Sequence, residues 1–577
     1  MEHEHFGGYL RMKKREKPKF SVGVDYGTNS VRGIVVDISD GREIAAKVYN
    51  YPSGKEGVIL DPKNPNLARQ NPTDYIKGFF ASVSGAVRVA KQTRGFDLQN
   101  VVGIGIDTTG STPIPVDRNG MPLGLNPKFR REPAAQAWLW KDHTSHAEAA
   151  EITETARKAG VPYPAKCGGV YSSEWFWSKI LHCLRTTPRV FDAAYSWVEC
   201  ADFVPAFVTG NMDPLKLKRG ICPAGHKAMY NDDWGGLPSK SFLKLLSPAL
   251  ADLRDRLYEK AVPSDQIAGY LTPEIAKKVG LPEGLPVAVG AFDAHMGAVG
   301  AGIKPGTLVK IIGTSTCDIM VSPLEQKLED IPGVCGIVPN SVIPGMYGIE
   351  AGQSAVGDIF NWFVSYLCPQ EFSKGDPHAN LSKVAARLKP GESGLLALDW
   401  NNGNRTILVD QTLTGLLAGQ TLQTTAPEIY RTLIEATAFG ALTIIKRIEE
   451  YGVQVREVVN CGGIAEKNPL LMQIYADVIN RPMKISRLSQ TCALGAATFG
   501  AVVGRAYKNV ETAQAKMTGL KPKVFKPNKA AAEVYAKLYQ LYRRLHDAFG
   551  TVSYQGEMNR LMKELIAIRD EARSQSC

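Results

Sequence analysis

The stretch VGVDYGTNS, residues 22–30, is an apolar strand that runs into an acidic residue and a glycine-threonine turn. A second stretch, TLVKIIGTST at residues 307–316, repeats the strand and the Gly-Thr turn in the other half of the chain. Backbone N–H groups and hydroxyls in such turns can donate hydrogen bonds to phosphate oxygens. One turn in each half therefore predicts two hairpins that hold a nucleotide's phosphates from both sides.

Each turn has its own candidate residues. Gly27 is expected to permit the tight backbone bend. Asp25, at the end of the first strand, is placed to hold Mg²⁺ through bound water, since Mg²⁺ prefers carboxylates and substrate phosphates. The candidate phosphate-binding residues are Gly27, Thr28 and Asn29 in the first turn and Gly313, Thr314 and Ser315 in the second. A plain hairpin with a polar turn is the alternative for either stretch alone.

A third segment, VVNCGGIAEKN at residues 458–468, predicts the rest of a nucleotide site. It reads as a strand, a double glycine and then a helix that starts at Asn468-Pro469. Gly462 and Gly463 would let an adenosine lie close to the backbone, and N–H groups at the helix start, near Asn468, favour an anion. A simple strand-to-helix turn is the alternative. Neither a GxxxxGK[ST] loop nor a GxGxxG fingerprint competes for the phosphates.

Asp293 is the candidate general base. It lies in VAVGAFDAH, residues 287–295, at the open end of an apolar strand. Phosphoryl transfer needs a group that accepts the proton of the acceptor hydroxyl. The alternative is that Asp293 only caps a helix beginning at Ala294. Polar residues elsewhere suit a sugar acceptor: the candidates, with Asp293, are Thr109, Ser111, Lys227 and Glu350. For the tryptophans of residues 138–143 and 171–177, core packing and sugar contact remain equal alternatives.

The composition limits the partners. With 577 residues, 44% hydrophobic and 22% charged, the chain is typical of water-soluble proteins with two or more domains. The net charge of +11 is spread out, so we expect no nucleic-acid partner. No apolar run reaches the roughly 18–20 residues of a membrane span. Ten scattered cysteines suit a cytoplasmic location, and residues 1–19 read as a disordered extension rather than a secretory signal.

The order of predicted elements repeats, although the sequence itself does not. Strands, a helix and a further strand recur after a boundary near residue 300. This repetition predicts two related α/β domains with a cleft between them. We assign residues 20–300 to a domain that holds the sugar, the first hairpin and Asp293 at its end, and residues 301–577 to an ATP-binding domain.

The chain resembles the FGGY carbohydrate kinase family, which shares the actin- and hexokinase-like (ribonuclease H-like) nucleotide-binding fold. The resemblance rests on GVDYGT at 23–28, GAFDAH at 290–295, GTST at 313–316 and Gly462-Gly463, with GLLAG at 415–419 and ALGAATFG at 493–500. It extends from residue 20 to about 550. It implies ATP and Mg²⁺ as cofactors, with Gly462-Gly463 against the adenosine and a cleft that closes on substrate.

Within this family, longer strings resemble the members that phosphorylate L-ribulose. They are LWKDH at 139–143, GGVYSSEWFW at 168–177, Ala201-Asp202 and CPAGHK at 222–227, besides GAFDAH. By this resemblance Asp293 deprotonates the C5 hydroxyl of the ketopentose. The alternatives are a kinase of D-ribulose or xylulose, and a non-catalytic sensor that binds ATP and sugar. The sequence leaves a homodimer open.

Overall fold

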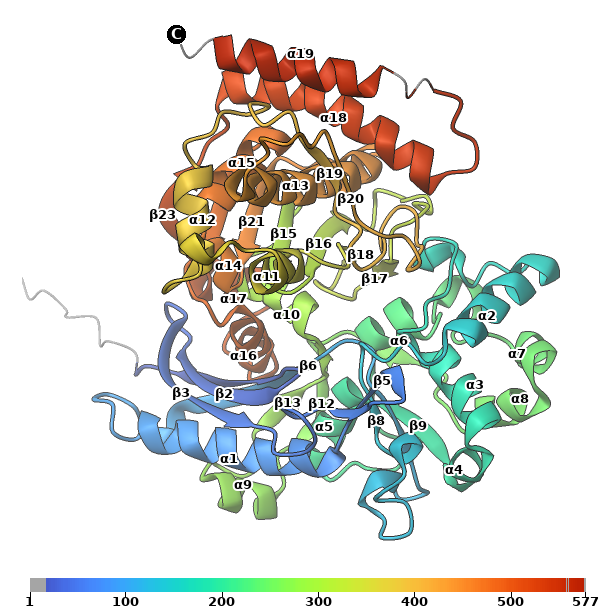
Figure 1. Cartoon of the computed structure of the whole chain (residues 1–577). Helices are drawn as coiled ribbons and strands as arrows, with labels where there is room; N and C mark the ends of the chain where they lie inside the picture. Colours follow the sequence, from blue (N-terminus) through green and yellow to red (C-terminus); the bar gives the residue numbers. More distant parts are fainter. Residues whose placement is uncertain (1–16, 557, 559, 575–577) are drawn as a thin grey trace, which may run out of the picture.

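The structure, a computed structural model, describes residues 17–556, 558 and 560–574. Of the extension expected at residues 1–19, residues 1–16 lie outside the described residues. Figure 1 shows two halves stacked one above the other, with the first half carrying a side bundle of helices. None of the helices in the described ranges is both long and apolar enough to cross a membrane.

The first half is built on a mixed sheet whose path is β3-β2-β1-β6-β13-β12. Apolar residues such as Val22, Val24 and Ile104 are fully buried on its strands, as a strand packed on both faces requires. The strands are β1 (Phe20–Tyr26), β2 (Ser30–Asp37), β3 (Arg42–Asn50), β6 (Val101–Thr108), β12 (Ile267–Tyr270) and β13 (Pro286–Ala288), with β14 (Ala291–Phe292) beside β6.

The second half is built on a sheet of the path β17-β18-β16-β15-β21-β22-β23. Its large apolar core lies between this sheet and the long helix α13 (Ala426–Glu450). The strands are β15 (Thr307–Ile312), β16 (Thr316–Pro323), β17 (Gly336–Pro339), β18 (Met346–Ala351), β21 (Glu457–Cys461), β22 (Met483–Ser486) and β23 (Leu520–Phe525).

The two sheets share one topology, which confirms the predicted duplication of an α/β unit. In the first half β1 pairs antiparallel with β2 and parallel with β6. In the second half β15 pairs antiparallel with β16 and parallel with β21. A long helix precedes the parallel partner in each case: α1 (Pro72–Ala90) and α13. Both predicted Gly-Thr stretches are therefore the turns of true hairpins at equivalent places.

Two helices pack between the halves (Figure 1): α10 (Asp293–Gly300) and α16 (Thr491–Val503). The approach of α16 to the first sheet is very close, because a Cβ added at Gly105 would lie 1.7 Å from the carbonyl oxygen of Ala496. From the sequence, the stretch 493–500 is assigned to the ATP-binding domain, residues 301–577. It packs instead on β1 and β6 of the first half, so it joins the two.

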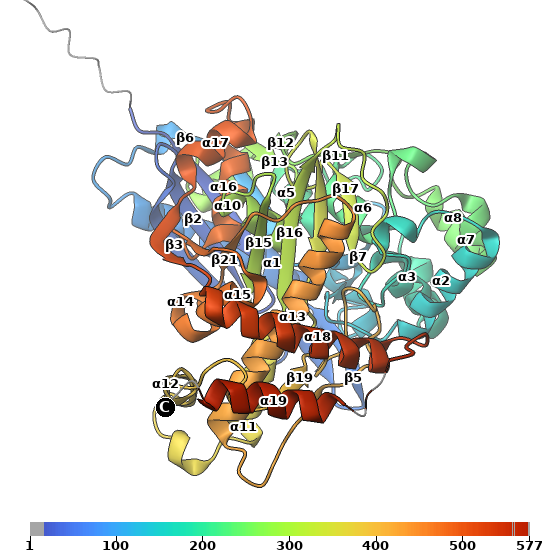
Figure 2. The same cartoon turned by 90° about the horizontal axis from the view of Figure 1, so that it is seen from above.

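The remaining elements cover the sheets and the side bundle. Helices α18 (Lys529–Gly550) and α19 (Leu561–Ser574) lie side by side at the outer face of the second half (Figure 2). The bundle contains α2 (His146–Ala159), α3 (Phe176–Thr186), α4 (Pro188–Ala193), α7 (Lys240–Leu246) and α8 (Pro248–Arg254). The site described below also uses α5 (Cys200–Thr209), α6 (Ile221–Lys227), α14 (Gly463–Lys467) and α15 (Pro469–Ile479).

The tryptophans of residues 138–143 and 171–177 differ in whether they reach a cavity, Trp175 belongs to the core as well, and sugar contact by any of them stays a prediction. Trp138 and Trp177 are 1% and 0% exposed and belong to the core of the side bundle. Trp140 and Trp175 line a cavity between the halves. Each of the two segments therefore contributes one tryptophan to the wall of this cavity.

Candidate active site

A cavity of about 210 Å³ lies between the two halves, and both contribute to its walls. Many residues singled out from the sequence meet there, although they are up to 322 positions apart (350 − 28). Those that line it are Thr28, Ser111, Lys227, Asp293, Gly313, Thr314, Ser315 and Glu350. Trp140, Glu174, Trp175, Phe292, His295, Cys317, Arg405 and Cys492 add to the lining.

Asp293 begins α10 at the wall of this cavity. Its Oδ1 accepts the backbone N–H of Ala294 at 2.7 Å, so it contacts the start of the helix and still faces the cavity. Burial raises the pKa of Asp293 to about 7, and the negative charge of Asp25 adds to the rise. A carboxyl with such a pKa is matched to taking a proton from a hydroxyl near neutral pH.

Asp25 lies opposite Asp107 on the neighbouring parallel strand. The Nη1 of Arg32 is 3.6 Å from the Asp25 carboxylate. Burial raises the pKa of Asp107 well above its ordinary value, with the charges of Asp25 and Asp293 adding. Both carboxylate oxygens of Asp107 are buried without a hydrogen-bond partner among the described residues. Carboxylate oxygens left open in this way fit the water-mediated Mg²⁺ site predicted at Asp25.

The two turns differ in how far their side chains are already engaged. Thr28 Oγ1 accepts the indole N–H of Trp140 at 3.1 Å, and the Asn29 amide donates to the carbonyl oxygen of Glu56 at 2.6 Å. Asn29 is exposed and does not line the cavity. Thr314 and Ser315 line it, and neither side chain forms a hydrogen bond within the described residues. The phosphate role of Asn29 stays a prediction, with its amide already bonded elsewhere.

The reason expected for the glycine in the first turn is wrong. Neither Gly27 nor Gly313 has a positive φ, so an ordinary residue could adopt either bend. A Cβ added at Gly27 would meet only the Ser30 oxygen, at 3.4 Å, and one at Gly313 only the Ser315 oxygen, at 3.9 Å. These glycines therefore leave open space over the turn, where a phosphate can approach the backbone.

The double glycine after β21 serves two purposes. Gly462 has φ +97°, and a Cβ there would lie 2.4 Å from the Ile312 oxygen, so the backbone itself requires glycine. A Cβ at Gly463 would meet nothing within 4 Å. A short helix, α14, follows directly, which the sequence did not predict. The predicted start of α15 is found, with Asn468 Oδ1 accepting the Leu471 N–H at 3.0 Å, so that side chain caps the helix.

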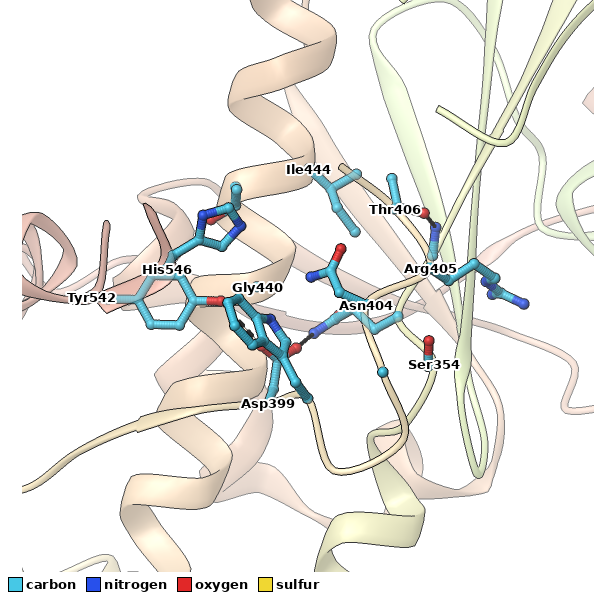
Figure 3. Close-up of a pocket in the computed structure, with 14 residues that line it drawn as sticks. Ser354, Asp399, Asn404, Arg405, Thr406, Gly440, Ile444, Tyr542 and His546 are labelled. Atoms are coloured by element: carbon cyan, nitrogen blue, oxygen red, sulfur yellow. Dashed lines mark hydrogen bonds between the residues drawn. The ribbon is translucent and has the colours of Figure 1, made fainter. Parts of the chain in front are cut away.

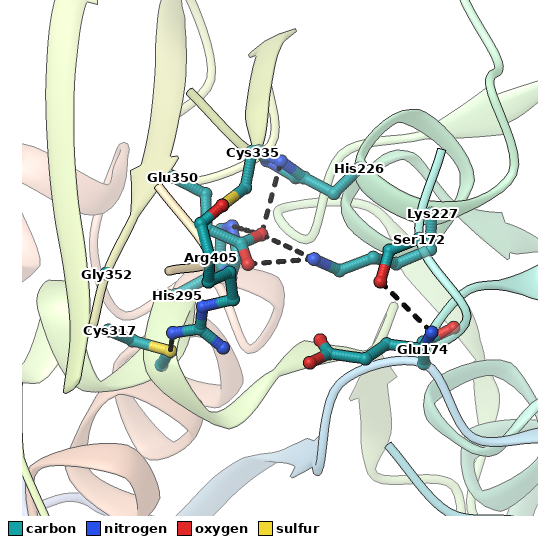
Figure 4. A network of polar contacts seen from close by, with 12 residues as sticks. Ser172, Glu174, His226, Lys227, His295, Cys317, Cys335, Glu350, Gly352 and Arg405 are labelled. Atoms are coloured by element: carbon teal, nitrogen blue, oxygen red, sulfur yellow. Dashed lines mark hydrogen bonds and ion pairs between the residues drawn. The ribbon is translucent and has the colours of Figure 1, made fainter. Parts of the chain in front are cut away.

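A buried ion pair joins the halves across the cavity (Figure 4). The Nζ of Lys227, at the end of α6, lies 2.7 and 3.0 Å from the two carboxylate oxygens of Glu350 on β18. Burial alone would lower the pKa of Lys227, but the Glu350 carboxylate outweighs it and the pKa lies above its ordinary value. Burial opposes the charge of Glu350 as well, yet Lys227 and the two neighbouring histidines keep its pKa low.

The segment after β6 brings one of its two candidates to the cavity. Ser111 lines the cavity, with φ +41°, a conformation that non-glycine residues rarely adopt. Its carbonyl oxygen accepts from Lys179 Nζ at 2.8 Å and its hydroxyl is 3.3 Å from Glu199. Thr109 does not line the cavity; its hydroxyl bonds that of Thr112 at 3.2 Å. The sugar-binding role of both stays a prediction.

Besides two cysteines, three residues of the lining with ionisable side chains were not predicted as site residues. His295 lies two positions after Asp293 on α10, so its spacing to the candidate base was a signal in the sequence. Arg405 lies in a loop between β19 (Leu396–Leu398) and β20 (Leu416–Ala418) and donates to the Thr316 oxygen at 2.5 Å. Glu174 lies in the run 172–174, which had no pattern to separate it from neighbouring polar residues.

A second, enclosed cavity lies behind Arg405 in the second half (Figure 3). Ser354, Asp399, Asn404 and His546 line it, but its volume of about 10 Å³ has room for roughly one water molecule. It is far too small for a sugar or a nucleotide. The cavity between the halves, which is lined by eight of the residues predicted from the sequence, is the candidate active site.

Comparisons with known proteins agree with this arrangement. Residues 20–300 match the N-terminal domain, and residues 308–503 the C-terminal domain, of the FGGY family of carbohydrate kinases. A ribulokinase of Halalkalibacterium halodurans is 42% identical, covering 96% of this chain and 98% of its own. A ribulokinase of Vibrio parahaemolyticus is 41% identical, covering 91% and 95%.

Solved structures with the same fold are more distant in sequence. The xylulose kinase of Rhodospirillum rubrum superposes with a TM-score of 0.74 at 23% identity, over 92% of this chain and 99% of that one. A Plasmodium falciparum glycerol kinase with ADP gives a TM-score of 0.72 at 16% identity, over 92% and 98%. At these identities the likeness shows the fold, including the predicted two-domain arrangement, and no more.

Proposed function

The chain belongs to the FGGY family of carbohydrate kinases, and we propose on that premise that it transfers the γ-phosphate of ATP to the 5-hydroxyl of L-ribulose. Relatives about 40% identical over nearly the whole chain carry the name ribulokinase. Their agreement favours ribulose over xylulose as the acceptor. The products are L-ribulose 5-phosphate and ADP, and the reaction would serve L-arabinose catabolism.

The observation that carries the proposal is the position of Asp293. Its carboxyl lies at the cavity wall beside the second hairpin, and burial raises its pKa to about 7. We assign Asp293 as the base that takes the proton of the acceptor hydroxyl while the oxygen attacks the γ-phosphorus. General-base catalysis of this kind contributes about 10²–10⁴ in rate.

The sugar would lie against the buried pair Lys227–Glu350. These side chains come from opposite halves, so a sugar that contacts both would bind best when the halves are together. Ser111 and Thr109 are proposed as further sugar contacts from the segment after β6. Closure of the halves on the sugar would exclude water and so limit hydrolysis of ATP.

ATP and Mg²⁺ are the cofactors, as in the family. The open turn of Gly313, Thr314 and Ser315 is proposed to receive the phosphates, with Gly27 and Thr28 on the other side; Asn29 would join them only if the first turn rearranges. The free space at Gly463 is proposed to receive the adenosine, with Gly462 and Asn468 shaping the backbone around it. Asp25 would hold Mg²⁺ through water, and the ion would neutralise the charge of the phosphates.

The test is a coupled ADP-release assay with MgATP against L-ribulose, D-ribulose, L- and D-xylulose and glycerol. We expect L-ribulose to give the highest kcat/KM, and Asp293→Asn to remove the turnover. Higher turnover of another pentulose would keep the kinase and change the acceptor. Binding of ATP and sugar without product would support the sensor that the sequence left open.

Three further proposals concern the molecule as a whole. Helix α11 (Gly357–Tyr366) exposes Trp362, Tyr366 and the adjoining Leu367, and this apolar surface supports a homodimer, which light scattering of wild type and Tyr366→Glu would test. We also propose a cytoplasmic location, supported by the free thiols of the nine described cysteines.

The third proposal is the domain assignment, in which residues 20–300 bind the sugar and residues 301–577 bind ATP. It would be tested by measuring which residues a bound nucleotide protects against proteolysis.

A further inference from the structure

His295 is a buried histidine whose two ring nitrogens are both left without a partner. Its side chain is 2% exposed, and neither Nδ1 nor Nε2 has a hydrogen-bond partner among the described residues. Leaving a buried polar group unpaired is destabilising. His295 also lines the cavity between the halves, so the missing partner can come from a molecule bound there.

A neighbouring histidine shows the contrast. His226 precedes Lys227 on α6, and its Nε2 bonds the hydroxyl of Ser341 at 3.0 Å. It is fully buried and does not line the cavity. The rings of His226 and His295 lie 4.5 Å apart. His226 is therefore held to Ser341 through Nε2, while its Nδ1 lacks a partner among the described residues; in His295, which unlike His226 lines the cavity, both nitrogens lack one.

We propose that His295 is a sugar-binding residue, which forms a hydrogen bond with a hydroxyl of the ketopentose other than the one that is phosphorylated. The inference rests on the proposed function. Asp293 lies two residues away and is assigned to the reacting hydroxyl, so His295 meets a different part of the same sugar. The three elements that hold the acceptor are then α6 through Lys227, β18 through Glu350, and α10 through both Asp293 and His295.

The charge of the surroundings suits a neutral acceptor. Burial lowers the pKa of His295 to about 4, so near pH 7 its ring is neutral, with one nitrogen that donates and one that accepts. A sugar hydroxyl can use either nitrogen. Glu350 Oε2 is 3.7 Å from Nε2, too far for a good hydrogen bond, which leaves that nitrogen available.

A metal ion is the competing explanation. Ligand atoms of His226, His295 and Glu350 lie within 4.8 Å of one another, the ligand set of many zinc sites. However, the ammonium of Lys227 already lies 2.7 Å from Glu350 and neutralises it. A divalent cation would therefore sit beside this buried positive charge with no further anion in the cluster. The sugar, which is uncharged, meets no such repulsion.

The test measures sugar affinity in the absence of nucleotide, by titration calorimetry of the full chain. His295→Phe keeps a ring in the packed space but removes both nitrogens, and we expect L-ribulose to bind about tenfold more weakly. His295→Asn and His295→Gln each return an amide, with one acceptor oxygen and one donor nitrogen, at a different reach from the backbone, and one of them should recover most of the loss. His378→Phe is the matched control, because that histidine bonds Tyr430 and Asn361, and it should bind as wild type does.

Deoxy sugars identify the contact. The 1-, 3- and 4-deoxy forms of L-ribulose each lack one hydroxyl, and wild type should lose affinity for the one that His295 binds. His295→Phe should then bind that deoxy sugar as well as it binds L-ribulose, since the partner is already missing. Additive losses for all three, or unchanged affinity in His295→Phe, would overturn the proposal.

Two outcomes separate this proposal from others. If wild type turns over no pentulose, the proposed function fails; if wild type turns over L-ribulose and His295→Phe binds it normally, only the role of His295 fails. Stoichiometric binding of Zn²⁺ by wild type that is lost in His295→Phe would assign the cluster to a metal instead. Should His295→Phe not fold, whichever of the Asn and Gln variants binds L-ribulose more weakly takes its place in the comparison with the deoxy sugars.

Discussion

The turn between β1 and β2 and the turn between β15 and β16 have the same topology but face the cavity with different chemistry. The first has the carboxyls Asp25 and Asp107 at its base, and its Thr28 hydroxyl is bonded to Trp140. The second presents Thr314 and Ser315 openly. A duplicated frame has thus diverged: one copy suits a hydrated cation and the other suits phosphate oxygens.

A lysine on the second hairpin, Lys310, is a further candidate for phosphate binding, but its ammonium is already paired. Lys310 lies on β15, directly before the Gly-Thr turn, where a free ammonium could reach a phosphate. Its Nζ is fully buried and lies 2.8 Å from both oxygens of Asp318, with Gln353 at 3.1 Å. This lysine therefore supports the hairpin from beneath, and the phosphates are left to the backbone and hydroxyls of the turn.

The largest effect is expected from removing the proposed base, Asp293, which lines the cavity together with the second hairpin. Asp293→Asn should lower kcat by about 10²–10⁴, because the amide cannot accept the hydroxyl proton. Sugar affinity measured without nucleotide should change little. Asp107→Asn, in the first half, is the matched carboxyl control and should cost less. Equal losses in the two variants would place the base with the first hairpin.

The pH profile sharpens the same assignment. Asp293 must be ionised to accept a proton, and burial raises its pKa to about 7. We therefore expect kcat/KM to fall about tenfold per pH unit below 7 and to level off above it. Steady-state rates between pH 5.5 and 8.5 measure this. A flat profile between pH 6 and 8 would show that another group limits the reaction.

If the first hairpin holds Mg²⁺ and the second holds the phosphates, substitutions in the two hairpins should respond differently to added Mg²⁺. Asp25→Asn should raise the free Mg²⁺ needed for half-maximal rate by about tenfold, since it removes one carboxylate from the cation's surroundings. Its rate should recover at high Mg²⁺. The measurement is a Mg²⁺ titration at saturating ATP and sugar.

Thr314→Ala is the counterpart in the second hairpin. Loss of one hydroxyl donor should raise KM for MgATP about two- to tenfold, as expected for a single hydrogen bond. Extra Mg²⁺ should not restore it. If Thr314→Ala were rescued by Mg²⁺ and Asp25→Asn were not, the proposed roles of the two hairpins would be exchanged.

The smallest expected effect is that of Asn29→Ala. Its amide donates to Glu56, and the residue is exposed outside the cavity. We expect KM for MgATP to stay within about twofold of wild type, because no more than a surface hydrogen bond is lost. A much larger increase would mean that the first turn rearranges to bind phosphate through Asn29, as the sequence predicted.

Local patterns predicted well the features that depend on neighbouring residues. The alternation of strand and Gly-Thr turn located both hairpins, and the Asn468-Pro469 pair located the start of α15. Patterns did not separate Ser111, which lines the cavity, from Thr109, which does not. The two belong to one polar run, and only the backbone bend at Ser111 decides which side chain faces inward.

The residues missed by sequence reasoning depend on contacts between distant segments. Arg405 reaches the cavity from a loop without regular structure, and its guanidinium is positioned by the Thr316 carbonyl, 89 residues away. The stretch 493–500 was assigned to the second half because of its position in the chain. Its place against Gly105 follows from a close helix-to-sheet approach that no local pattern encodes.

The sequence by itself determined the two α/β halves, their hairpins, the base candidate Asp293 and, through its resemblance, the family. These are properties of short segments, whose apolar periodicity and turn residues act locally. Only the tertiary structure decided that Lys227 neutralises Glu350 across the cavity, that burial moves the pKa of Asp293 to about 7, and that the ring nitrogens of His295 find no hydrogen-bond partner in the described part of the chain. Burial and charge neighbourhood arise from segments more than a hundred residues apart, so they exist only once the halves are packed together.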